Sequence, residues 1–140
     1  FFIALYDRRT RVVSFPLWNN EHTPTPPAPR PLARGLTDYV LSTGQALLIT
    51  EPELDAFTAR TGFAPLFGRC AAWIAAPMVI AGETVGAVSL QDYAGPAAYR
   101  PEDLRLLEFV AGQIAAALQR VEVETARRES QEYFAKLFHA

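Results

Sequence analysis

The chain has 140 residues, half of them hydrophobic, and a formal net charge of −2 at neutral pH. This length suits one domain with its own core. The near balance of acidic and basic residues lacks the basic surface needed to bind nucleic acid or an anionic membrane, and no apolar run approaches the roughly 18 residues of a membrane span. The single cysteine cannot form an internal disulfide. We therefore expect a soluble, cytoplasmic domain without nucleic-acid or membrane contacts.

The first segment predicts two strands. Residues 1–6 (FFIALY) and 11–18 (RVVSFPLW) are rich in β-branched and aromatic residues, and the polar turn DRRT between them is typical of an antiparallel hairpin. The first strand has no polar lead, so we expect the chain to be part of a longer protein. Five prolines between Pro24 and Pro31 then favour extended backbone without amide donors. We interpret that stretch as an irregular connecting loop rather than a partner-binding polyproline motif.

The middle of the chain predicts two helices and a strand. Residues 36–43 (LTDYVLST) carry apolar side chains at helical spacing, with Thr37 or Asp38 available to satisfy the first free amide groups. Residues 46–50 (ALLIT) follow as a strand. A second helix begins near Pro52 and ends at the next glycine.

Two central strands come next, at residues 72–80 and 84–91, joined by a tight turn at residues 81–83 that contains a glycine. Both strands are almost continuously apolar. Such strands are buried on both faces, so helices must cover each side of the sheet. The pattern therefore predicts a three-layer α/β fold.

From Pro101 onward the sequence predicts one long helix. Pro101 suits a first helical position, and apolar residues recur at three- and four-residue spacing: Leu104, Leu107, Ala111, Ile114, Leu118 and Val121. The residues after Val121 are mostly charged, so we expect this part of the helix to project from the domain.

This succession of segments resembles the GAF domain family, in the variant found in bacterial sensor kinases and cyclic-dinucleotide signalling enzymes. The matching stretches are FFIALYD, RPLARGLTDYVLSTGQALLI, WIAAPMVIAGETVGAVSLQDY and YRPEDLRLLEFVAGQIAAAL. They span residues 1–118 and lack the helix that normally precedes the first strand. The resemblance implies an α/β (α+β) fold with a mainly antiparallel sheet of about five or six strands, helices on both faces and a long C-terminal helix.

The end of the chain predicts a connection to another module. Residues 119–132 are interpreted as a signalling helix linker. The final stretch ESQEYFAKLFHA resembles the opening of a PAS domain, so residues 133–140 are interpreted as the start of a PAS-like domain. A competing interpretation is a histidine-kinase phosphoacceptor box with His139 as the acceptor, but that motif would need an acidic residue and Leu-Arg after the histidine.

No catalytic or metal-binding group of residues stands out. His22 lies in the proline-rich loop and His139 in the tail, so neither can be paired with Cys70 from the sequence, and the acidic residues are scattered. We therefore expect no catalytic residue, no metal and no cofactor. The module itself is not expected to be an enzyme.

The resemblance suggests roles for Cys70 that the surrounding residues do not support. The reductases of free methionine sulfoxide in this family need more than one thiol, and its bilin-binding photoreceptors commonly place a histidine beside the attachment cysteine, whereas Ala71 and Ala72 follow here. The Asn-Lys-X-(n)-Phe-Asp-Glu signature of cyclic-nucleotide binding is missing, since the sole lysine is Lys136. We interpret Cys70 as a small structural residue, with cysteine-linked chromophore binding as an alternative.

The resemblance also implies that one sheet face lines a ligand cavity while the other packs on the terminal helices. Residues two apart on a strand share a face, so alternate strand residues are assigned to the cavity face as in similar members of the family. Together with the loop before the central strands, this gives the ligand-binding candidates for an unknown small molecule: Phe2, Tyr6, Phe67, Trp73, Ala75, Val88, Leu90 and Asp92. Two alternatives stay open. The space is filled by aromatic side chains as core, namely Trp73, Phe57, Phe63 and Phe67, or Asp92 caps the turn that follows its strand.

Two functional hypotheses follow. In the first, the chain is a sensor module of a histidine kinase or cyclic-dinucleotide enzyme that binds a small molecule and relays a change through its C-terminal helix to an output domain in the same chain. A homodimer would form along that helix, through Leu107, Ala111, Ile114, Leu118 and Val121. In the second, the chain is a ligand-free dimerisation scaffold.

Overall fold

The structure is a computed structural model that describes residues 1–66 and 68–139. Its elements are, in chain order, β1 (Phe2–Asp7), β2 (Val12–Trp18), β3 (Arg30–Pro31), α1 (Leu36–Thr43), β4 (Leu47–Thr50), the 3₁₀ helix η1 (Glu51–Glu53), α2 (Leu54–Thr61), β5 (Ala72–Ile80), β6 (Glu83–Asp92) and α3 (Pro101–His139). The predicted strands and helices are all present, with bounds close to those expected. The addition is β3, a short strand in the proline-rich stretch that the sequence did not indicate.

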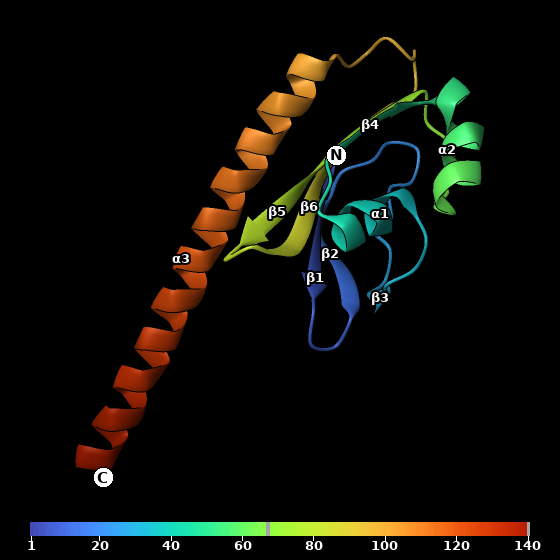
Figure 1. Ribbon diagram of the computed structural model, residues 1–140. Helices are drawn as coiled ribbons and strands as arrows, with labels where there is room; N and C mark the ends of the chain where they lie inside the picture. Colours follow the sequence, from blue (N-terminus) through green and yellow to red (C-terminus); the bar gives the residue numbers. More distant parts are fainter. Residues whose placement is uncertain (67, 140) are drawn as a thin grey trace.

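The strands form one antiparallel sheet in the order β3-β2-β1-β6-β5-β4. Figure 1 shows α1 and α2 on one face of this sheet, here called the α1 face, and α3 across the other, the α3 face. Both faces of the central strands are therefore covered, as their continuous apolar sequence predicts. The three-layer fold is confirmed.

Each face has its own core. The core of the α1 face contains most of the buried aromatic side chains: Phe2, Ala4, Val13, Phe15, Leu36, Val40, Leu41, Ile49, Leu54, Phe57, Trp73, Ala75 and Ala87. The core of the α3 face is smaller and aliphatic: Ile74, Ala76, Met78, Val88, Leu107, Ala111 and Ala115. Because side chains alternate along a strand, β5 contributes to both cores.

The turn between β5 and β6 has the backbone geometry of a tight hairpin. Ala81 and Gly82 have positive φ values of 52° and 79°, and the flanking residues Ile80 and Glu83 pair across the turn. Two successive positive φ values give the turn a twist that matches the strands on either side. The predicted hairpin is confirmed.

A bulge in this hairpin decides which β6 side chains share a face with Trp73. The register shifts between Met78 and Val79, and beyond the shift Trp73 pairs with Gln91. If the register set at the turn had continued, Trp73 would pair with Leu90 instead. A one-residue shift moves every following side chain to the other face of the sheet.

Only the first half of α3 packs on the sheet. Leu107, Ala111 and Ala115 are buried beneath it, whereas every side chain from residue 119 to 138 is exposed. Figure 1 shows this second half extending well beyond the sheet, as the charged sequence predicts. No helix in the described part of the chain combines the length and apolar character needed to cross a membrane.

The side chains predicted to form a dimer seam lie mostly against the sheet. The exception is Val121, which is 62% exposed; the other four pack in the α3-face core, namely Leu107, Ala111, Ile114 and Leu118. Their helical spacing is that of the sheet-packing face, because an amphipathic helix on a domain surface turns its apolar stripe inward. Leu107 and Ala111 are buried against the sheet, so their choice as seam residues was wrong. Ile114 and Leu118 are only partly buried, and their role in a seam, like that of Val121, stays a prediction. The homodimer itself stays a prediction.

Asp38 connects α1 to β3. Its side chain is fully buried and receives two hydrogen bonds from Arg30, from Nη1 to Oδ1 and from Nη2 to Oδ2, each 2.9 Å long. The same two oxygens accept the backbone amides of Ala33 (2.8 Å) and Gly35 (3.0 Å). This bidentate arrangement is the strongest geometry for a guanidinium and a carboxylate. It fixes the amino end of α1 against the proline-rich segment.

Asp38→Asn is expected to lower the free energy of unfolding by about 3 kcal/mol, because it leaves a mostly buried guanidinium without its counter-ion. Asp55→Asn is the matched control. It makes the same chemical change on a 90% exposed side chain that pairs with Arg69, and should cost less than about 1 kcal/mol. Urea denaturation followed by tryptophan fluorescence measures both. Equal losses for the two variants would contradict the role assigned to Asp38.

Candidate ligand cavity

A cavity of about 60 Å³ lies on the α1 face, where the amino end of α1 meets the sheet. It has space for a few water molecules or for a small organic molecule. Residues from several elements of this face line it: Phe2, Asn20, Arg30, Gly35, Leu36, Thr37, Ile49, Thr50, Leu54, Pro65, Leu66, Gly68, Cys70, Trp73, Gln91 and Tyr93. A wider hollow of about 690 Å³ lies at the surface beside the β1–β2 turn, and it is lined by the polar residues of that turn together with apolar residues of the strands and of α3.

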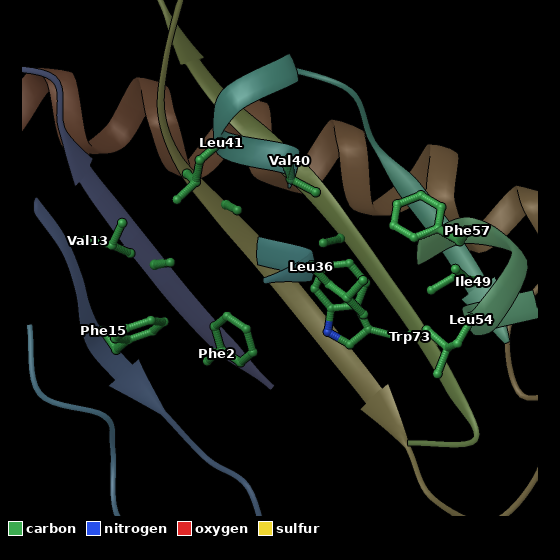
Figure 2. Close-up of a cluster of buried hydrophobic side chains, with 13 residues drawn as sticks. Phe2, Val13, Phe15, Leu36, Val40, Leu41, Ile49, Leu54, Phe57 and Trp73 are labelled. Carbon is green, nitrogen blue, oxygen red and sulfur yellow. The ribbon is translucent and has the colours of Figure 1, made fainter. Parts of the chain in front are cut away.

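Trp73 forms the floor of the cavity. Its side chain is only 4% exposed. In Figure 2 its indole lies between Phe2 from β1 and the pair Ile49 and Leu54 from β4 and α2. The indole is held by these neighbours and still lines open space, so Trp73 is a wall of the cavity.

The phenylalanines expected to fill this space as core pack elsewhere. The rings of Phe57 and Phe63 meet Tyr39 edge to face, at centroid distances of 5.1 and 5.4 Å. Neither ring lines the cavity. The third, Phe67, lies outside the described residues. The described phenylalanines of this loop and helix therefore leave the cavity open.

The other predicted site residues on the α1 face fall into two groups. Phe2 and Trp73 line the cavity. Ala75 and Tyr6 belong to the core of the same face, but neither is at the cavity, and Tyr6 lies beside the β1–β2 turn. Phe67, outside the described residues, cannot be placed in either group.

Val88 and Leu90 lie on the opposite face from the one predicted. Both pack in the α3-face core. The bulge in the β5–β6 hairpin is the reason, because it brings Gln91 opposite Trp73 and Ser89 opposite Ala75. The prediction for Val88 and Leu90 was wrong.

Asp92 has the turn-capping role that was its alternative. Its Oδ1 accepts the amides of Ala94 (2.6 Å) and Gly95 (3.3 Å). These are the local hydrogen bonds by which aspartate stabilises a turn. Asp92 does not line the cavity.

Sequence reasoning missed the polar groups of the cavity. Gln91 donates from Nε2 to the Ser89 hydroxyl (3.3 Å), and Asn20 donates from Nδ2 to the Tyr93 hydroxyl (2.9 Å). Thr37, on the first turn of α1, is 8% exposed and lines the cavity. The alternation of Ser89 and Gln91 in an apolar strand was the available signal, because it marks two polar residues that share one face.

Cys70 also lines the cavity and is half-buried. Burial raises the pKa of its thiol above the ordinary value, and the carboxylates of Glu51 and Asp92 act in the same direction. The thiol is therefore protonated at neutral pH, the opposite of what a nucleophilic cysteine needs. The described residues include no cluster of three or more His, Cys, Asp or Glu side chains that could hold a metal ion.

Comparisons with known proteins identify the fold. Residues 1–119 match the family of the GAF domain. Among solved structures, the chain is similar to residues 122 to 287 of a methyl-accepting chemotaxis protein, with a TM-score of 0.69 and 17% identity over 89% of this chain and 80% of that one. It is also similar to the GAF domain of an Acinetobacter phosphoenolpyruvate-protein phosphotransferase, with a TM-score of 0.64 and 14% identity over 87% of this chain and 72% of that one.

A third similar structure is an enzyme. It is the free methionine-R-sulfoxide reductase from Neisseria meningitidis in complex with its substrate, with a TM-score of 0.61 and 16% identity over 78% of this chain and 60% of that one. No curated protein matches the chain. At these identities the structural matches establish a shared fold.

Cys70 is expected to react slowly with iodoacetamide. At pH 8 the alkylation rate in the folded chain should be at least about tenfold below that of the same thiol in the urea-unfolded chain, because the raised pKa lowers the thiolate fraction and the cavity wall restricts access. The folded chain should approach the unfolded rate only as the pH rises above the ordinary pKa of a thiol. Mass spectrometry of timed samples measures both rates. Faster alkylation of the folded chain at pH 7 would indicate an activated thiol.

Proposed function

The chain belongs to the GAF domain family, and we propose that it is a regulatory sensor module of a bacterial signalling protein such as a histidine kinase or a cyclic-dinucleotide enzyme. In this proposal the module lies in the cytoplasm and binds a small molecule in the α1-face cavity. α3 then passes the change to an output domain in the same chain. The module itself catalyses no reaction.

The arrangement of β5 carries the proposal. Successive residues of this strand face opposite layers, so that Trp73 lines the cavity and Ile74 packs in the core beneath α3. β5 is also the strand on which α3 mainly packs. A ligand that displaces the Trp73 indole would therefore displace the strand that supports α3. Close-packed interiors transmit such shifts because they have no free volume to absorb them.

The relatives in structure support a regulatory setting. Two of the similar folds come from a chemotaxis protein and from the GAF domain of a phosphotransferase. The exposed second half of α3 is suited to connect the module to a following domain. We propose that residues 133–140 begin that domain, which would be PAS-like.

The ligand prediction is tested by a thermal-shift screen with cyclic nucleotides, amino acids, aromatic metabolites, small organic acids and bilins. A ligand at about 100 times its Kd should add about 2.7 kcal/mol to the free energy of unfolding and raise Tm. In the Trp18→Phe variant Trp73 is the single tryptophan, so the same ligand should also change the emission of this residue.

The control is the reverse variant, Trp73→Phe, in which only Trp18 reports. Its emission should change less, because Trp18 does not line the cavity. If no compound raises Tm and the Trp73 emission stays constant throughout the screen, the sensor proposal is wrong.

One observation favours the scaffold as a second candidate. The cavity of about 60 Å³ is far smaller than the roughly 300–1,000 Å³ of a drug-sized ligand site. A scaffold needs no cavity, only a fixed geometry of α3. This candidate would be supported if no compound in the screen binds and the chain forms the same dimer with and without those compounds.

We propose that the dimer forms on the side of α3 that faces away from the sheet. Leu106, Phe109 and Val110 are exposed there, at 62%, 64% and 38%, and Phe109 and Val110 both lie about one helical turn after Leu106. Contiguous exposed apolar side chains on a helix mark an interaction surface. A second copy of the chain, with its α3 alongside, would bury this stripe and place the two projecting halves next to each other.

Leu106→Gln combined with Phe109→Gln is expected to weaken self-association at least about tenfold, since it removes the apolar stripe without changing the packing on the sheet. The matched control is Glu102→Gln with Arg105→Gln, an exposed pair on the first turns of the same helix. Sedimentation velocity over a concentration series measures both. An unaltered chain that remains monomeric at every concentration would contradict the dimer.

A further inference from the structure

The following inference rests on the proposed function, because it concerns what the same cavity binds. We infer that the cavity binds a small carboxylate, with its anionic group at the amino end of α1 and its apolar part against Trp73. Four features of the cavity lead to this ligand class: the helix end, an unpaired hydroxyl group, the charge of the lining and the size of the space.

The amino end of α1 opens onto the cavity. Gly35, Leu36 and Thr37 all line it. The first amide groups of a helix have no acceptor inside the helix, and the helix dipole adds partial positive charge at this end. Asp38 accepts the amides of Ala33 and Gly35 but not those of Leu36 and Thr37, which are left for an anionic ligand.

The Thr37 hydroxyl is the second, independent feature. The Thr37 residue is more than nine-tenths buried, it lines the cavity, and its hydroxyl has no hydrogen-bond partner among the described residues. The hydroxyl is not sealed off from the cavity, because the fully buried side-chain atom without a partner in the described residues is Arg30 Nε. A hydroxyl with so little access to bulk water gains from a hydrogen bond to a bound molecule. A ligand oxygen in the cavity would accept this hydrogen bond. Thr50 shows the contrast, because it lines the same cavity but donates its hydroxyl to Glu53 Oε1 (2.6 Å).

The charge of the lining disfavours a cation. Among the described residues around the cavity, Arg30 is the one charged side chain and no acidic side chain is present. Asp38 is close by, but it is fully buried and its two oxygens are occupied by Arg30 and backbone amides. A cationic ligand would find no counter-ion here. An anion would meet the two free amides and the Thr37 hydroxyl.

The remaining walls and the volume set the rest of the ligand. Trp73, Ile49 and Leu54 form an apolar surface, which suits a short hydrocarbon part. The Gln91 amide adds one neutral polar group. About 60 Å³ of space admits only a few non-hydrogen atoms. The class that fits is therefore a short-chain carboxylic acid in its ionised form.

The test compares propionate with propionamide on the unaltered chain. The two molecules have nearly the same size and shape and differ in charge. At constant ionic strength with chloride as the other anion, we expect propionate to bind at least about tenfold more tightly, because hydrogen bonds to a charged acceptor are stronger. Thermal shift and the Trp73 emission of Trp18→Phe both measure the affinity. Acetate and benzoate then bracket the size of the apolar part.

Variants of the two threonines locate the carboxylate. Thr37→Val removes the hydroxyl at nearly constant volume and should weaken propionate binding about tenfold, whereas Thr37→Ser keeps the hydroxyl and should keep most of the affinity. Thr50→Val is the matched control. It makes the same change in the same cavity, at a hydroxyl that is already bonded to Glu53, and should leave the affinity unchanged.

Each outcome decides the inference. Equal affinities for propionate and propionamide, or equal effects of Thr37→Val and Thr50→Val, overturn it while leaving the cavity as a ligand site. If other screened compounds bind but no carboxylate does, the inference is likewise overturned and the cavity remains a ligand site. If nothing binds, the proposed function fails together with the inference. The comparison of propionate with propionamide needs no variant, so it decides the matter even if Thr37→Val does not fold.

Discussion

The bidentate pair between Arg30 and Asp38 is the constraint on which the cavity depends. A carboxylate is tolerated in a core only when its charge and its hydrogen bonds are both matched, and Asp38 obtains this from Arg30 and two backbone amides. Because Arg30 is in β3 and Asp38 is in the first turn of α1, the pair fixes where this helix begins relative to the sheet edge. The amino end of α1 is thereby held over the cavity rather than over solvent.

The size of the side chains on the sheet explains why space remains at this point. The middle of the α1 face carries small residues, Ala75, Ala87 and Ser89, and there α1 packs directly on β5 and β6. Phe2 and Trp73 are the large side chains beside them, and they line the cavity together with Leu36 from the first turn of α1. Where a large side chain and a small one lie side by side on a sheet, a gap remains unless another side chain fills it. The cavity lies at such a boundary between large and small side chains.

The positions of the helices and strands could be predicted because each depends on local periodicity and turn residues, as the hairpin at Ala81 and Gly82 illustrates. The site was less predictable because it depends on register and on contacts between distant segments. The bulge that brings Gln91 opposite Trp73 lies in β6, where Val85 has no partner in β5, and the apolar runs of the two strands fit either register, so Val88 was assigned to the wrong face. The pairing of Arg30 with Asp38 was equally invisible, because Arg30 lies in a proline-rich stretch that reads as a loop.

α3 shows what distinguishes a sensor from a scaffold in physical terms. Of its 39 residues, those up to Leu118 gain stability from the sheet, whereas the exposed half is polar on most sides. Most of the stability of a helix in a protein comes from packing an apolar face, and the exposed half packs on no other described element. Contacts with a partner helix or a following domain would therefore stabilise it further. In a scaffold those contacts are the same in every state. In a sensor these contacts must differ between the ligand-bound and ligand-free states. The displacement of α3 that changes them would pass through β5, since α3 has its main support on that strand.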